Sequence, residues 1–117
     1  MTTMRGPIFK LALMLAVVVG VSAANADELP IAARSWGGVV RAAPDDHAQR
    51  LASLREGETL TILAHTKVQL NGFEFFRIRY RENRTGYQWG GILCPVGAAL
   101  KGAFQVCPAS GPMPGQK

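Results

Sequence analysis

The chain lacks the short motifs on which most small enzymes depend. It contains no G-x-S-x-G nucleophile motif, no H-E-x-x-H zinc motif and no glycine-rich phosphate loop after an apolar strand. Ser35 and Ser53 have no histidine beside them in the sequence. These absences predict a protein that is not an enzyme and that has neither catalytic residues nor a cofactor.

Cysteine is scarce. The two cysteines, Cys94 and Cys107, do not have the C-x-x-C spacing of a redox couple, and His47 and His65 are not closely spaced from either of them. A metal pair or a redox couple is therefore the less favoured interpretation, and we predict no metal site. An isolated pair of cysteines in an oxidising compartment forms a disulfide. We accordingly predict a structural Cys94–Cys107 bridge.

Long hydrophobic runs are limited to one, Leu11 to Val21, which is shorter than the ~20 residues of a membrane-spanning helix. Arg5 and Lys10 precede this run, and a short segment of small residues ending at Ala26 follows it. This order is typical of a secretory signal peptide. We predict that residues 1–26 are a signal peptide cleaved after Ala26, with an uncleaved anchor as the alternative. The mature protein is then periplasmic or secreted and has no stable membrane span.

Acidic residues are outnumbered, with 8 Asp and Glu against 13 Lys and Arg and a net charge of +5. Cleavage of the signal peptide lowers this net charge by two, because Arg5 and Lys10 are removed. A mildly basic domain is compatible with an anionic partner such as a cell-wall polymer or a lipid head group. Nucleic acid is not an expected partner, because the basic residues are few and export removes the usual target.

Helical periodicity of any length is also missing, and short strands and turns take its place. Thr59 to Leu63 alternates polar and apolar residues, as half-buried strands do. Asn71-Gly72 is typical of a hairpin turn, and Phe73 to Arg81 is the strongest strand pattern. Further expected elements are a strand opening at Trp36 to Arg41, a turn at Arg84 to Gly86 and a short last strand at Tyr87 to Trp89. Gly57 and Gly86 are expected in backbone conformations closed to other residues.

These patterns divide the mature chain into three parts. Residues 27–35 are expected to be an irregular lead-in, and residues 36–93 to be one small domain. Residues 94–117 are expected to be a proline- and glycine-rich tail tied by the disulfide. Its end, from Ser110 onward, is expected to be disordered.

Alternation along Phe73–Arg81 separates a core face from an outer face. Phe76, Ile78 and Tyr80 are expected in the core. The outer face combines aromatic rings, which offer a stacking surface, with arginines, which offer forked donors. The candidate ligand-binding residues on this face and on the following strand are Phe75, Arg77, Arg79, Tyr87 and Trp89. The alternative is a solvated face whose arginine stems cover apolar surface.

One loop carries the remaining candidates for chemistry, Asp45, Asp46 and His47. Adjacent side chains diverge in an extended loop, which is poor geometry for paired acid and base catalysis. We interpret the three as surface residues.

Five segments in sequence order resemble a bacterial SH3-type domain. They are Val39 to Pro44, Ala52 to Glu58, Leu60 to Leu63, Asn71 to Arg79 and Gly86 to Leu93. The resemblance covers about residues 36–93 and implies a small, strongly bent SH3-like barrel of five antiparallel strands. The residue patterns alone indicate a small all-β barrel or sandwich.

The same resemblance implies binding and not catalysis. Bacterial SH3-like domains often accompany cell-wall enzymes and are associated with peptidoglycan or peptide binding. Phe75 occupies the place of the first of the family's paired aromatics, and Tyr87 that of the aromatic after the late glycine. Ile92 departs from the tyrosine of many relatives, so a groove for proline-rich peptides is not expected. We predict an exported, non-catalytic module that recognises a cell-envelope component such as peptidoglycan. The alternative is a periplasmic protein–protein interaction module, either an inhibitor or an accessory subunit of an envelope complex.

Overall fold

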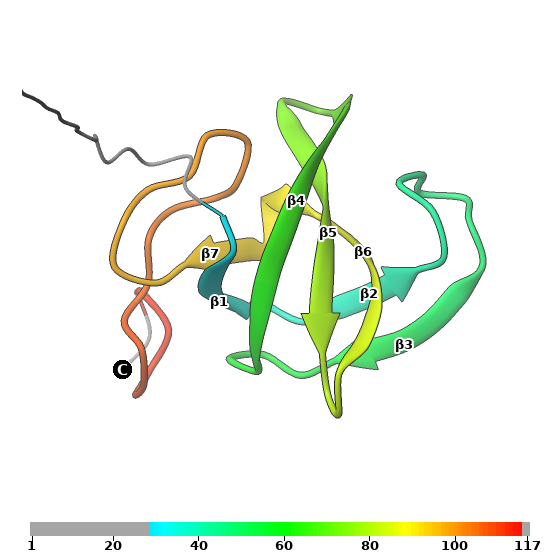
Figure 1. Cartoon of the computed structure of the whole chain (residues 1–117). Helices are drawn as coiled ribbons and strands as arrows, with labels where there is room; N and C mark the ends of the chain where they lie inside the picture. The colour runs from blue at the N-terminus through cyan, green and yellow to red at the C-terminus, as the bar shows by residue number, and fades with distance from the viewer. Residues whose placement is uncertain (1–28, 116–117) are drawn as a thin grey trace, which may run out of the picture.

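The fold is built on a single antiparallel β-sheet (Figure 1). The computed structural model describes residues 29–115, so the predicted signal peptide lies outside the described residues. The strands are β1 (Ile31–Ser35), β2 (Gly38–Arg41), β3 (Arg50–Leu54), β4 (Thr59–Leu70), β5 (Phe73–Tyr80), β6 (Arg84–Trp89) and β7 (Leu93–Pro95). They lie in the order β3-β2-β6-β5-β4-β1-β7, and the one helical segment described is the 3₁₀ turn η1 (Gly90–Ile92). The all-β class is confirmed, with a sheet of seven strands where five were expected.

The β4–β5 hairpin has the turn that its sequence predicts. Asn71 and Gly72 connect the two strands with φ angles of 52° and 89°. Two consecutive positive φ angles suit the right-handed twist of the paired strands, and asparagine and glycine tolerate them best. Leu60 and Ile62 at the start of β4 are buried, as the alternating pattern predicts.

The turn between β5 and β6 lies earlier than predicted. Glu82 and Asn83 form it, with φ angles of 50° and 66°. Arg84 to Gly86, the predicted turn, belongs to β6 and pairs with β5. The prediction was wrong because glycine usually marks a turn, whereas Gly86 lies inside a strand.

The core lies against one face of β5. Phe76, Ile78 and Tyr80 are buried there, which confirms the predicted core face. The other buried members of the cluster are Ala33, Val40, Leu54, Leu60, Ile62, Leu93 and Leu100. They come from β1 to β4, from β7 and from the segment after β7, so almost every element contributes to the same core.

The described part of residues 27–35 is not an irregular lead-in. Ile31–Ser35 form β1, which pairs with β4 through Ala33 and Leu60 and with β7 through Arg34 and Cys94. Alanine and arginine carry little strand preference. The strand therefore depends on pairing with partners that are distant in the sequence.

The tail after residue 93 is likewise part of the domain. Leu93–Pro95 form β7, Leu100 joins the core, and Met113 is only 3% exposed against the disulfide. The guanidinium of Arg34, itself buried, donates to the carbonyl oxygens of Gly57 at 3.1 Å, Pro108 at 2.8 Å and Gly111 at 2.7 Å. The expectation of disorder from Ser110 onward is therefore wrong as far as Gly115.

Cys94 and Cys107 form the predicted disulfide, with their Cα atoms 5.5 Å apart. Both side chains are buried, and Trp36 and Val96 pack against them. A buried disulfide fits a protein of an oxidising compartment, such as the periplasm or the cell exterior.

Candidate functional site

The predicted binding residues lie together on the outer face of the β5–β6 ribbon. Phe75 is opposite Trp89, and Arg77 is opposite Tyr87. Residues directly opposite on antiparallel strands have side chains on the same face and close together. Arg79, two residues after Arg77 and hence on the same face, is opposite Thr85 of β6. The register thus brings all five candidates to one face, with the aromatic pair at one end and the arginines at the other.

Phe75 is more buried than the sequence pattern indicates, since it is only 3% exposed. Trp89 lies across from it and is half-buried. The indole Nε1 of Trp89 donates to the backbone oxygen of Leu70 at 2.8 Å, and its ring contacts Phe73 edge-on at 5.4 Å between centroids. These contacts hold the Trp89 ring against the end of the β4–β5 hairpin. Phe75 therefore offers a ligand only part of its ring.

That exposed part of Phe75 lies in a groove of about 200 Å³. The lining side chains are Val39, Arg41, Asp46, Leu70, Phe75, Trp89 and Ile92. An adjoining hollow shares Asp46, Leu70 and Phe75 and continues toward Pro44 and Val68. Arg41 and Asp46, the charged residues of the groove lining, were not predicted as site residues, because they come from β2 and from the loop after it. No local pattern places these segments beside Trp89.

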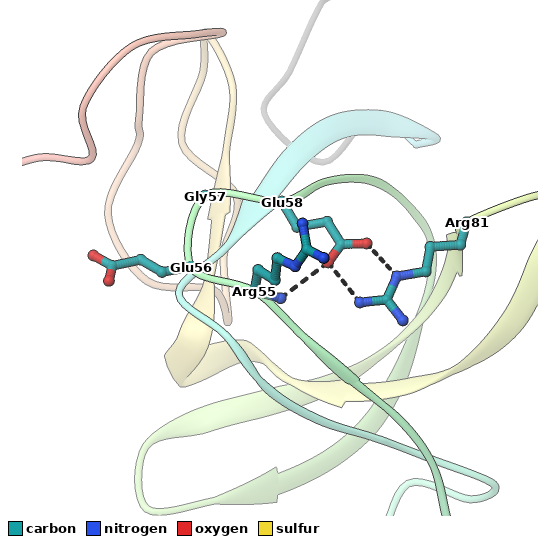
Figure 2. A pocket seen from close by; sticks show the side chains of 5 residues that line it. All are labelled: Arg55, Glu56, Gly57, Glu58 and Arg81. Carbon is teal, nitrogen blue, oxygen red and sulfur yellow. Dashed lines mark hydrogen bonds and ion pairs between the residues drawn. The ribbon is translucent and has the colours of Figure 1, made fainter.

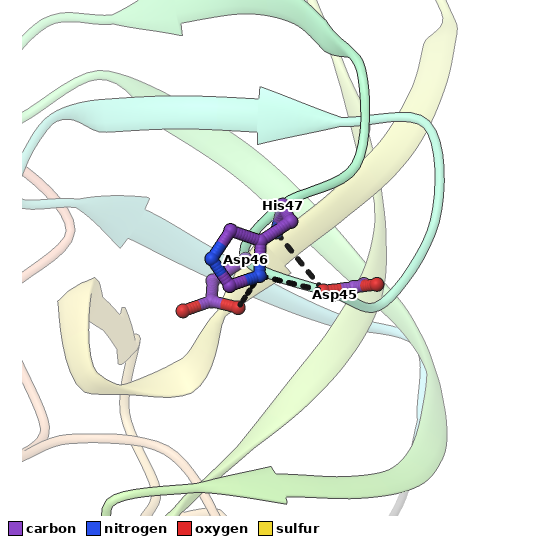
Figure 3. A group of neighbouring side chains, drawn as sticks. All are labelled: Asp45, Asp46 and His47. Atoms are coloured by element: carbon purple, nitrogen blue, oxygen red, sulfur yellow. Dashed lines mark hydrogen bonds and ion pairs between the residues drawn. The ribbon is translucent and has the colours of Figure 1, made fainter.

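The loop residues Asp45, Asp46 and His47 do not diverge as expected. Figure 3 shows the imidazole of His47 beside both carboxylates, with Nδ1 3.1 Å from Asp46 Oδ1 and 3.8 Å from Asp45 Oδ1. Their possible ligand atoms lie within 4.8 Å of one another, and all three residues are exposed. Exposed acidic groups in such an arrangement are common without an ion, and we assign no metal to this one.

A separate hollow, of about 520 Å³, lies between the β3–β4 turn and the end of β5 (Figure 2). Arg81, which the sequence places on the outer face with the other arginines, turns toward Glu58. Its Nε and Nη2 bind the two carboxylate oxygens at 2.6 and 2.8 Å, and Nη2 also donates to the backbone oxygen of Ser53. The hydrogen bond from Arg81 lowers the pKa of Glu58 below its usual 4.5. The Glu58–Arg81 pair joins two segments of the sheet, and Arg55 and Glu56 are the other charged residues of this hollow.

The Glu58–Arg81 pair predicts an acid-dependent loss of stability. Because the pKa of Glu58 is lower in the folded than in the unfolded protein, the stabilisation is fully present above about 4.5 and is lost as pH falls through the folded pKa. Urea unfolding of the wild type and Arg81→Gln should therefore show a difference at pH 7 that shrinks at pH 3. Arg84→Gln is the control, since Arg84 forms no ion pair with a described carboxylate. An Arg81→Gln effect of the same size at both pH values would contradict the prediction.

A second carboxylate–imidazole contact, also missed by sequence analysis, lies at the other end of β5. Glu74 is buried, and both its oxygens lie 3.1 Å from Nδ1 of His65. Its Oε2 also accepts the backbone N–H of Lys67 at 2.8 Å, and its own N–H donates to Gly102. Glu74 thereby links the hairpin to the tail, which gives the pair a structural role.

Comparisons with known proteins leave the family of the chain open. No family model, no curated protein and no solved structure matches it. The likeness to bacterial SH3-type domains therefore stays a prediction that rests on the order of the quoted segments. Within residues 29–115, no helix has the length and apolar character needed to cross a membrane.

Proposed function

We propose that the protein is an exported, non-catalytic binding module that recognises a cell-envelope component such as peptidoglycan. One observation carries this proposal: the pairs Phe75–Trp89 and Arg77–Tyr87 are consecutive on the outer face of one β-ribbon, and Phe75 and Trp89 line a mainly apolar groove beside it. Aromatic and apolar walls provide contact area, and the arginines provide directed donors for carboxylate or phosphate groups. A few polar groups around an apolar hollow are typical of a ligand site.

The contacts of the histidines support a non-catalytic role. Among residues 29–115, His47 and His65 contact carboxylates, and neither imidazole forms a hydrogen bond with a hydroxyl or a thiol. A nucleophile activated by histidine needs such a contact. The disulfide and the predicted signal peptide support export.

The alternative function, a periplasmic protein–protein interaction module, is favoured by a different surface. Phe104 and Val106 of the tail are 39% and 38% exposed. Phe104 contacts Trp36 at 6.4 Å and Phe73 at 5.9 Å between ring centroids. Aromatic side chains at the surface are typical of protein interfaces. Crosslinking in intact cells separates the two functions, because one stoichiometric protein partner supports the alternative and diffuse wall association supports the first.

The main proposal predicts that the outer face controls retention on purified peptidoglycan. Because Phe75 is buried, its truncation would disturb folding, so the better variant is Arg77→Gln with Tyr87→Ala. We expect its retention in a pull-down to fall about tenfold, which corresponds to the loss of roughly 1.4 kcal/mol of binding free energy. Arg84→Gln, on the same ribbon but opposite the buried Tyr80, is the matched control and should be retained like the wild type. Equal retention of the double variant and the wild type, with unchanged melting temperatures, would contradict the proposal.

A further inference from the structure

Two arginines that sequence analysis left aside extend the outer face beyond the β5–β6 ribbon. Arg41 of β2 is opposite Tyr87 of β6 and also opposite Arg50 of β3. Arg77 of β5 lies on the other side of Tyr87. The four side chains therefore form one line across four adjacent strands, which we call the cationic row (Arg50, Arg41, Tyr87 and Arg77). With about 4.8 Å between neighbouring strands, the row is about 14 Å long.

The arginines of the cationic row form no ion pair within the described chain, although Asp46 lines the same groove as Arg41. None of its three arginines, nor the neighbouring Arg79, forms an ion pair with a carboxylate in residues 29–115. Within residues 29–115, their one side-chain hydrogen bond is donated by Arg41 Nη1 to the backbone oxygen of Ala48 at 2.8 Å. Arg41 and Arg50 are register partners beside an irregularity in the β2–β3 pairing, and like charges on opposing strand positions destabilise a sheet. An anion bound at the row would remove this repulsion.

We propose that the cationic row binds an extended anionic polymer of the cell envelope, a chain that carries phosphate or carboxylate groups and lies across the strands. This inference rests on the proposed binding role of the outer face and names the ligand chemistry of that face. Arginine suits both kinds of anion because its planar fork donates two parallel hydrogen bonds. Charges in a line, with an aromatic ring between them, match a chain better than a single small anion.

A lipid surface fits the row less well. Helices and patches that bind membranes combine cations with large exposed apolar side chains that enter the bilayer. The large hydrophobic residues exposed in residues 29–115 are Leu51, Val68, Phe104 and Val106. None of them belongs to the cationic row. Chain-like anions are therefore the favoured ligand, and membrane binding becomes an outcome that the experiment can detect.

The test measures binding of the mature protein to long-chain inorganic polyphosphate and to poly-glutamate over a range of salt concentrations. If three to four arginines each release about one counterion, the logarithm of the association constant should fall with the logarithm of salt with a slope of about −3. Binding to either polymer with such a slope supports the proposal. The polymer that binds more tightly shows whether the row prefers phosphate or carboxylate groups. Absence of binding to both, or tighter binding to vesicles of anionic phospholipid than to either polymer, would overturn it.

The decisive variant is Arg50→Glu. It should weaken polymer binding about tenfold or more, because it removes one contact and adds a repulsive charge. It should also raise the melting temperature, because the repulsion between Arg41 and Arg50 becomes an attraction. Arg84→Glu makes the same change of charge outside the row and should keep polymer binding within about twofold of the wild type. An equal loss of polymer binding in the two variants would show a general effect of charge and would overturn the proposal that the cationic row is the binding site.

The two proposals can fail separately. If neither polymer binds while retention on peptidoglycan still depends on Arg77 and Tyr87, the cationic row is wrong and the proposed function stands. If the polymers bind through Arg50 but the protein is not retained on peptidoglycan, the proposed envelope component is wrong and the proposal of the cationic row is supported.

Discussion

Replacing Gly86 with valine is expected to destabilise the domain by about 3 kcal/mol or more, which is a large part of the free energy of unfolding of a small domain. A Cβ atom at Gly86 would lie 2.5 Å from Cγ1 of Val40, 3.1 Å from the backbone oxygen of Arg41 and 3.2 Å from Cδ1 of Leu51. Val40 is completely buried and cannot move aside without disturbing the core. The reason for the glycine is therefore the close approach of β2 to β6.

This reason differs from the one that the sequence indicates. Gly57 has the expected positive φ, 86°, but Gly86 is not among the residues with positive φ. Thermal unfolding of Gly86→Ala and Gly86→Val separates the two explanations, because a steric cause makes valine clearly worse than alanine. Gly72→Ala is the control. Its Cβ would meet nothing within 4 Å, so the positive φ of 89° is the one source of strain in this variant. A Gly86→Val protein that melts like the wild type would contradict the close packing of β2 on β6.

Replacing Cys94 with serine is expected to lower the free energy of unfolding by about 3 kcal/mol, and the melting temperature by about 15 °C. The bridge spans 13 residues, and its loss restores the freedom of that loop in the unfolded chain. The sequence places this bridge after the last strand, where its loss is expected to lower the melting temperature without unfolding the barrel. In the structure Cys94 lies within β7, opposite Arg34, and the loop closed by the bridge contains the core residue Leu100.

Melting curves with and without reducing agent measure this effect. Reduction should lower the melting temperature of the wild type toward that of Cys94→Ser and leave the variant unchanged. Cys107→Ser is the matched variant and should behave in the same way. A Cys94→Ser protein that melts within a few degrees of the oxidised wild type would show that the tail contributes little to the core.

The candidate site was partly predictable from the sequence. Alternation along β5 and β6 correctly places Arg77, Tyr87 and Trp89 on the outer face, since side-chain direction depends only on neighbouring residues. The burial of Phe75 was not predictable, because its neighbours in the groove, Trp89 and Leu70, come from other strands. Asp46 and Arg41 reach the groove only through the pairing of β2 with β6. The opposition of Arg41 and Arg50 depends on a register shift between Val40 and Arg41 that no local pattern signals.

Some features follow from the sequence alone, because they depend on neighbouring residues or, for the disulfide, on a single possible pairing of cysteines. The Asn71-Gly72 turn follows from local backbone preference, the inward direction of Phe76 and Ile78 from strand geometry, and the disulfide from there being just two cysteines. Long-range pairing produced the rest: the strand at Ile31–Ser35, the packed tail, the need for glycine at position 86 and the line of cations on the outer face. Each of these arises where segments far apart in the sequence come into register, and the energy of such contacts exists only after the sheet has assembled.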